Sequence, residues 1–125
     1  FVGISNVLDP ESCEINQVKG LKMAISKGYK NIAITISNAK DIPEIRKIEK
    51  SNSCNILIFG VHTTGISRDD AAIFMEYGDI ITACMSEELK EIGDKKNIYK
   101  TKTKIPIYAP SEKGKNAIEL RLKEI

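Results

Sequence analysis

The side chains best suited to chemistry in this sequence are its single histidine and one of its three cysteines. Histidine is the residue type that ordinarily gains or loses a proton near neutral pH, so His62 is a candidate for a catalytic or ligand-binding role. Cys84 stands between an apolar run and an expected helix start, where the helix end favours the reactive thiolate form of cysteine. The alternatives are a histidine that only caps a turn and a cysteine that packs as a small apolar side chain.

These two residues support an enzyme hypothesis. Cys84 would be a thiolate nucleophile or metal ligand, His62 a base or co-ligand, and Asp9 would orient the histidine. The spacing of histidine and cysteine does not complete a zinc site, so the presence of a metal or a cofactor stays unknown. Cys13 and Cys54 are expected to be structural.

Small polar residues at other expected strand ends favour a ligand-binding role instead. The turn Thr63-Thr64-Gly65 offers hydroxyl groups and a permissive backbone near a helix start, which suits a small anionic ligand. Ordinary turn chemistry is the alternative for these three residues. The further candidates for the ligand-binding set are Asn38, Ser86 and Ser111.

The common nucleotide-binding motifs are missing. Neither GxGxxG after the first apolar run nor GxxxxGK[ST] occurs in the sequence. A response-regulator receiver needs an aspartate at the end of its third strand, and this chain has Val61 and His62 there. These classes of protein are therefore set aside.

Apolar runs and helix-spaced patterns alternate along the chain. The runs expected as strands are residues 1–8, 32–37, 55–61 and 80–83, with a last strand within residues 98–109. Helices are expected to begin near Glu14, Asp41, Ser67, Ser86 and Ser111. Gly28 stands where a left-handed residue would close the first helix.

This alternation predicts a single α/β domain over residues 1–125. We expect a doubly wound, mostly parallel five-stranded sheet with helices on both faces, in a flavodoxin-like or Rossmann-like three-layer fold. The expected strand order is 2-1-3-4-5, with 3-2-1-4-5 as the rival. Ligands of such sheets bind outside the carboxyl ends of the strands, so Asp9, His62 and Cys84 are expected to be neighbours.

Composition narrows the class of protein further. The net charge of +2, with 16 lysines against 3 arginines, argues against a nucleic-acid partner. The apolar runs are too short to span a membrane. Three widely spaced cysteines fit the reducing cytoplasm. Because the chain begins with Phe1, we expect a fragment of a longer protein.

Six segments carry a family resemblance. They are Val7-Leu8-Asp9-Pro10-Glu11, Asn16-Gln17-Val18-Lys19-Gly20, residues 58–65 (IFGVHTTG), residues 79–84 (DIITAC), residues 104–109 (KIPIYA) and residues 112–115 (EKGK). Together they resemble methanogenesis marker protein 8, a family of unassigned function, over what would be the C-terminal part of its longer proteins. The resemblance implies an archaeal, cytoplasmic setting linked to methane formation. It supplies no catalytic residues, because none is established for the family.

Three functional hypotheses follow. In the first, the domain binds a small anionic molecule or a component of a methanogenic enzyme, and helps to mature that enzyme or to handle its cofactor. In the second, it is an enzyme domain that uses Cys84 and His62. In the third, it is a structural domain of a larger assembly, packed against its own N-terminal region ahead of Phe1.

Overall fold

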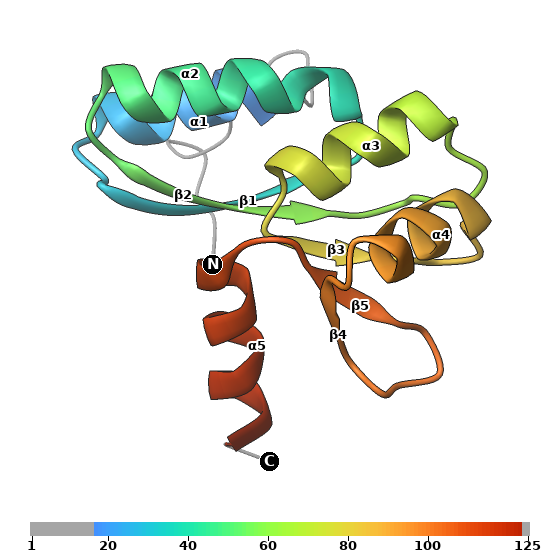
Figure 1. Ribbon diagram of the computed structural model, residues 1–125. Helices are drawn as coiled ribbons and strands as arrows, with labels where there is room; N and C mark the ends of the chain where they lie inside the picture. The colour runs from blue at the N-terminus through green and yellow to red at the C-terminus, as the bar shows by residue number, and fades with distance from the viewer. Residues whose placement is uncertain (1–16, 124–125) are drawn as a thin grey trace.

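The computed structural model describes residues 17–123 as a mixed α/β domain with an open sheet (Figure 1). In chain order, the elements are α1 (Gln17–Ser26), β1 (Asn31–Ile36), η2 (Ala39–Asp41), α2 (Ile42–Ser51), β2 (Asn55–Gly60), α3 (Arg68–Tyr77), β3 (Ile80–Thr82), α4 (Glu87–Lys95), β4 (Tyr99–Lys100), β5 (Ile107–Ala109) and α5 (Glu112–Lys123). The strand expected over residues 1–8, together with Asp9 and Cys13, lies outside the described residues. Of the helices described, none is long and apolar enough to cross a membrane.

Several residues predicted to start or end helices do so, while the start predicted near Glu14 lies outside the described residues. Ser67 accepts the backbone N–H of Asp70 at the start of α3, and Ser86 accepts that of Leu89 at the start of α4. Gly28 follows α1 with a φ of 90°, a left-handed conformation that glycine adopts without steric cost. Local signals therefore fixed these helix boundaries.

The strand order is β1-β2-β3-β5-β4, which differs from both predicted orders. The predicted orders count the run 1–8 as the first strand, so β1, β2 and β3 correspond to predicted strands 2, 3 and 4. β1 pairs with β2 in parallel from Asn31↔Asn55 to Ile36↔Gly60, so no strand lies between them. The order 2-1-3-4-5 requires a strand at that place. β2 also pairs directly with β3, whereas the rival order 3-2-1-4-5 keeps these two strands apart. β5 runs antiparallel to both β3 and β4, so the single last strand expected within residues 98–109 is a hairpin.

The helices are distributed unequally over the two faces of the sheet. The connections β1–α2–β2 and β2–α3–β3 advance in the same direction, and right-handed crossovers therefore place α2 and α3 on the same face. A doubly wound sheet needs a reversal of strand order, and the parallel strands described here show none. α5 lies on the other side of the sheet (Figure 1).

Two hydrophobic clusters match this arrangement. The main one lies between the sheet and helices α1 to α4, and its buried members include Leu21, Ile45, Ile58, Phe74 and Leu89. The smaller one consists of Ile80, Ala109 and Ile118, beneath α5. The main core thus packs against β2 and β3, and these strands carry the candidate site.

Candidate functional site

The carboxyl ends of β2 and β3 form a shared edge of the sheet. Phe59 pairs with Ile80, and Gly60 with Ile81, in parallel register. The loops after these strands, residues 61–67 and 83–86, therefore leave the sheet side by side; we call them together the rim. This confirms the prediction that the strands before His62 and Cys84 are parallel neighbours.

Three threonine hydroxyl groups tie the rim together. Thr63 donates to the carbonyl of Thr82 at 2.5 Å, and Thr64 donates to the carbonyl of Cys84 at 3.1 Å. Thr82 in turn donates to the carbonyl of Gly60 at 3.2 Å. Thr63 is fully buried, so its hydroxyl fixes the loop, whereas Thr64 is exposed at the surface. The two loops therefore form one connected unit.

Two residues of the rim have a left-handed backbone conformation that is uncommon for residues other than glycine. φ is 54° at His62 and 44° at Met85. Ser53 and Asn97 also have positive φ, but each closes the last turn of a helix, where a left-handed residue is usual. His62 and Met85 instead follow strands. Each holds strain of about 1–3 kcal/mol that no helix end explains.

The side chains that solvent reaches at the rim include an imidazole and a thioether. His62 is exposed, and Met85 is 83% exposed. Cys84 is a half-buried free thiol. Gly65, with a φ of 71°, completes the turn after Thr64. Over residues 17–123 no group of three or more histidine, cysteine or acidic side chains converges to hold a metal ion.

Asn38 lies at the same edge of the sheet, after β1. Its Oδ1 accepts the backbone N–H of Lys40 at 3.2 Å, which caps the short helix η2. A hollow of about 530 Å³ lies beside it and is lined by Lys22 of α1 and Glu44 of α2, among others. Those two side chains form a long ion pair at 4.0 Å across this hollow. Asn38 is therefore exposed next to a polar recess.

Ser86 and Ser111 differ from the expectation that they line the same site. Ser86 is fully buried, and its hydroxyl caps α4. Ser111 lies at the opposite edge of the sheet, because β5 is antiparallel to β3 and ends beside the start of that strand. Its hydroxyl donates to the carboxylate of Asp79 at 2.6 Å. The expectation for Ser111 assumed that the last strand runs parallel to its neighbour.

The helix starts at the rim carry acidic side chains. Asp69 and Asp70 lie in the first turn of α3, and Glu87 and Glu88 in that of α4. Carboxylates at these positions offset the partial positive charge of the helix N-termini. The two helix starts therefore offer little attraction to an anion.

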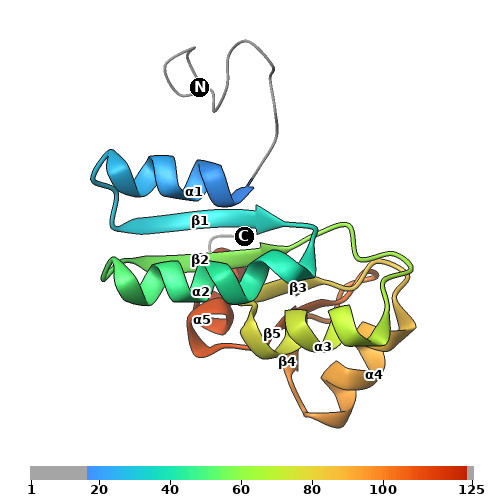
Figure 2. The ribbon, with the colours of Figure 1, turned by 90° about the horizontal axis from the view of Figure 1, so that it is seen from above.

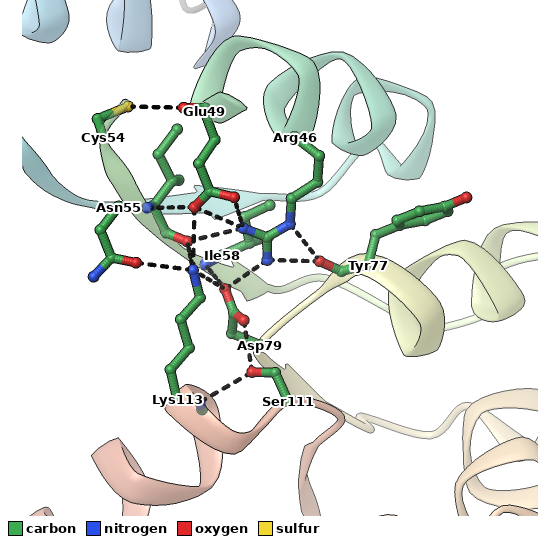
Figure 3. A network of polar contacts seen from close by, with 11 residues as sticks. Arg46, Glu49, Cys54, Asn55, Ile58, Tyr77, Asp79, Ser111 and Lys113 are labelled. Atoms are coloured by element: carbon green, nitrogen blue, oxygen red, sulfur yellow. Dashed lines mark hydrogen bonds and ion pairs between the residues drawn. The ribbon is translucent and has the colours of Figure 1, made fainter. Parts of the chain in front are cut away.

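At the opposite edge, Asp79 is the centre of a charged cluster that sequence analysis missed (Figure 3). Its carboxylate accepts Arg46 Nη2 at 2.7 Å and the backbone N–H of Ile58 at 2.7 Å, besides Ser111. Arg46 also donates to the carbonyl of Tyr77 at 2.7 Å. The buried carboxylate thus joins α2, β2 and the start of α5.

Glu49 and Lys113 complete this cluster. Glu49 accepts the backbone N–H of Ile56 at 2.7 Å and Lys113 Nζ at 3.1 Å. Lys113 also donates to the carbonyl of Ile56 at 2.6 Å. Within the described part of the chain every buried side-chain nitrogen or oxygen has a hydrogen-bond partner. The cluster is therefore saturated, and its geometry supports a structural role.

No local pattern could have revealed this cluster. Arg46 and Glu49 are three residues apart on one helix, which is ordinary for an exposed helix face. Their partners Asp79 and Lys113 lie more than thirty residues further along the chain. Only the fold brings the four together.

Comparison with known proteins establishes kinship. The family model described as "Uncharacterized protein conserved in archaea (DUF2099)" matches residues 2–123. The chain belongs to this archaeal family. "Uncharacterized protein MJ0054" of Methanocaldococcus jannaschii is 38% identical over 119 residues, which are 95% of this chain and 41% of that protein. No solved structure matches.

The archaeal family agrees with the broader part of the resemblance seen in the sequence. The chain spans about two fifths of the length of the Methanocaldococcus jannaschii relative. Both the family and this relative are described as uncharacterized, so they lend no reaction to the rim. The narrower identification as methanogenesis marker protein 8 stays a prediction.

Proposed function

We propose that this domain binds a small molecule at the rim, and that it serves a methanogenesis-linked protein in the archaeal cytoplasm. Maturation of a methanogenic enzyme, or handling of one of its cofactors, is the proposed role. Support for the setting comes from the archaeal family and the relative in Methanocaldococcus jannaschii. Support for the site comes from the rim alone.

The observation that carries the proposal is the pair of left-handed residues at neighbouring strand ends. Backbone strain in a folded protein persists where the surroundings impose it, and it concentrates at functional sites. Here the two left-handed residues, His62 and Met85, also carry an exposed imidazole and an exposed thioether, on two loops that leave the sheet side by side. The hydroxyl of Thr64 fixes the loops relative to each other through the carbonyl of Cys84. A preorganised pair of loops suits ligand binding.

The charges around the rim bear on the kind of ligand. Asp70 and Glu87, with their acidic neighbours, weigh against the anionic ligand that the sequence suggested. An exposed imidazole and an exposed thioether favour a largely uncharged ligand with hydrogen-bonding groups. An anionic compound would have to be held by His62 or by the recess near Asn38 instead.

Isothermal titration calorimetry tests this proposal. The probes are coenzyme M, coenzyme B, nucleotides and uncharged analogues of the first two. Binding of one of them should weaken at least tenfold in His62→Ala and in Thr64→Val, which keeps the side-chain shape but loses the hydroxyl. Ser53→Ala, at a left-handed residue just before the amino end of β2 and so at the opposite end of that strand from the rim, is the control. Unchanged affinity in both rim variants would exclude this site.

The second candidate is an enzyme domain with Cys84 as thiolate nucleophile or metal ligand and His62 as its base or co-ligand. The observation that favours it is a free, partly accessible thiol whose loop is bonded to the loop of the histidine. Iodoacetamide labelling across pH tests it, with half-buried Cys54 as the internal reference thiol. The enzyme candidate predicts faster labelling of Cys84 near neutral pH, lost in His62→Ala. Equal rates for the two thiols would remove its basis.

A further inference from the structure

The face of the sheet opposite α2 and α3 is only partly covered. Along β1, the side chains of Asn31, Ala33 and Thr35 alternate with the inward-facing isoleucines and are exposed. Parallel strands ordinarily have both faces covered. The crossovers place α2 and α3 on one face, so the other face of β1 and β2 must be covered from elsewhere.

A hollow of about 330 Å³ lies where this open face meets α5. Its lining is mainly aliphatic and amide, and consists of Asn31, Ile32, Ala33, Asn55, Leu57, Lys113 and Ala117. The one charged group there is the ammonium of Lys113, which already pairs with Glu49 at 3.1 Å. The hollow therefore suits an uncharged, apolar surface and not an ion.

α5 borders this hollow and projects from the sheet. Figure 1 shows the helix extending away from the strands, and Figure 2 shows it nearly end-on. Lys113, Ala117 and Leu120 have the spacing of one helix face, and the first two line the hollow. Leu120 is 64% exposed. Lys113 and Ala117 are held by contacts with the rest of the domain, whereas the side chain of Leu120 extends this face into solvent. An isolated helix of 12 residues is marginal in water, so packing against Leu120 would stabilise the second half of α5.

We propose that this corner, formed by the open face of β1 and β2 and by the Lys113–Ala117–Leu120 side of α5, is a docking surface for the rest of the longer family protein. The Methanocaldococcus jannaschii relative has more than half of its length outside the matched region, because the match covers 41% of it. The chemistry of the corner selects an apolar helix face with neutral polar flanks. This docking surface is separate from the rim and does not depend on the function proposed there.

Hydrogen–deuterium exchange tests the proposal. In a chimera, this chain replaces the matched 119 residues of the relative and so gains the remaining polypeptide. Backbone amides in the second half of α5 should exchange at least tenfold more slowly in the chimera than in this chain alone. Leu120→Asp should abolish that difference. Tyr29→Asp, at an apolar residue that is 61% exposed in the turn before β1, is the matched control and should preserve it.

Three outcomes would overturn the proposal. The first is equal exchange of α5 in the chimera and in the chain alone, and the second is protection that survives Leu120→Asp. The third is protection of α5 in this chain alone with a dimer in sedimentation, which would assign the corner to a second copy. If the chimera fails to fold, the relative itself, whole and truncated to its matched region, gives the same comparison at the aligned helix.

Discussion

The carboxylate of Asp79 accepts the backbone N–H of Ile58 at 2.7 Å, one residue before β3 begins. The backbone N–H of Asp79 donates in return to the carbonyl of Ile58 at 3.0 Å. β3 pairs only with the last residues of β2, so a side chain here completes the hydrogen bonding that a longer strand would supply. On the edge of β2 that lies beyond the reach of β3, backbone N–H groups in the amino half of the strand therefore donate to the side chains of Glu49 and Asp79.

Asp79→Asn should therefore destabilise the protein strongly. Arg46 and Ile58 donate to the same oxygen, Oδ2, so an amide oxygen could still accept from both. The amide nitrogen would then face Ser111 in place of an acceptor, and the side chain would carry no charge to balance the guanidinium. We expect a loss of roughly 3–5 kcal/mol in the free energy of unfolding, measured by urea denaturation. Glu91→Gln is the control, because the Arg68–Glu91 pair has the same 2.7 Å distance but side chains that are 61% and 69% exposed. That change should cost less than about 1 kcal/mol, and equal costs would contradict the role given to Asp79.

Two glycines within helices should respond to alanine in opposite ways. A methyl group at Gly93 of α4 would collide with the buried ring of Tyr108. Gly93→Ala should therefore lower the free energy of unfolding by about 1–3 kcal/mol. Gly20 of α1 has open space at this position, so Gly20→Ala should raise stability by about 0.5–1 kcal/mol through helix propensity alone. Thermal unfolding followed by circular dichroism distinguishes the two, and a stabilised Gly93→Ala would show that Tyr108 packs elsewhere.

The phenol of Tyr108 should make stability fall at high pH. Burial, and then the hydrogen bond to Asp94, raise the pKa of Tyr108 from 10.0 to about 12. The unfolded chain therefore loses this proton at a lower pH than the folded protein does, which favours unfolding as the pH rises from 10 toward 12. The contribution is fully present below pH 10. We therefore compare the urea midpoint of the protein with that of Tyr108→Phe at each pH, because lysine titration affects both and cancels in the difference. This difference should shrink as the pH rises from 10 toward 12.

Much of the helical structure could be predicted because its signals are local. Capping serines such as Ser67 and Ser86, and the glycine after α1, act within a few residues of sequence. Strand order could not be predicted, because an apolar run such as β2 fits beside any other apolar strand. The pairing of β1 with β2 decided it. The direction of β5 was also missed, because it follows from a hairpin that the sequence around Pro106 does not mark clearly.

For the candidate site, features that follow from local sequence were predictable and those that depend on strand direction or distant elements were not. His62 and Cys84 were placed at neighbouring strand ends because each directly follows an apolar run, and parallel neighbours share an edge. Ser111 was misplaced because its position depends on the direction of β5. The buried carboxylate of Asp79 gave no local signal, since its partners come from distant elements.

The left-handed backbone at His62 gives the last prediction, which separates strain from the imidazole. His62→Gly removes both, because glycine adopts a φ of 54° without steric cost. Relief of about 1–3 kcal/mol of strain exceeds the entropic cost of glycine, so this variant should unfold at a higher urea concentration. It should nevertheless lose the ligand found by calorimetry.

Two further variants complete this comparison. His62→Ala keeps the strain and loses only the imidazole, so it should fail to bind without becoming more stable. Ser53→Gly relieves a left-handed residue at a helix end, where φ is 50°, and should gain stability with unchanged affinity. If His62→Gly gains stability and binds as tightly as the parent protein, the strained backbone at the rim has no connection with ligand binding.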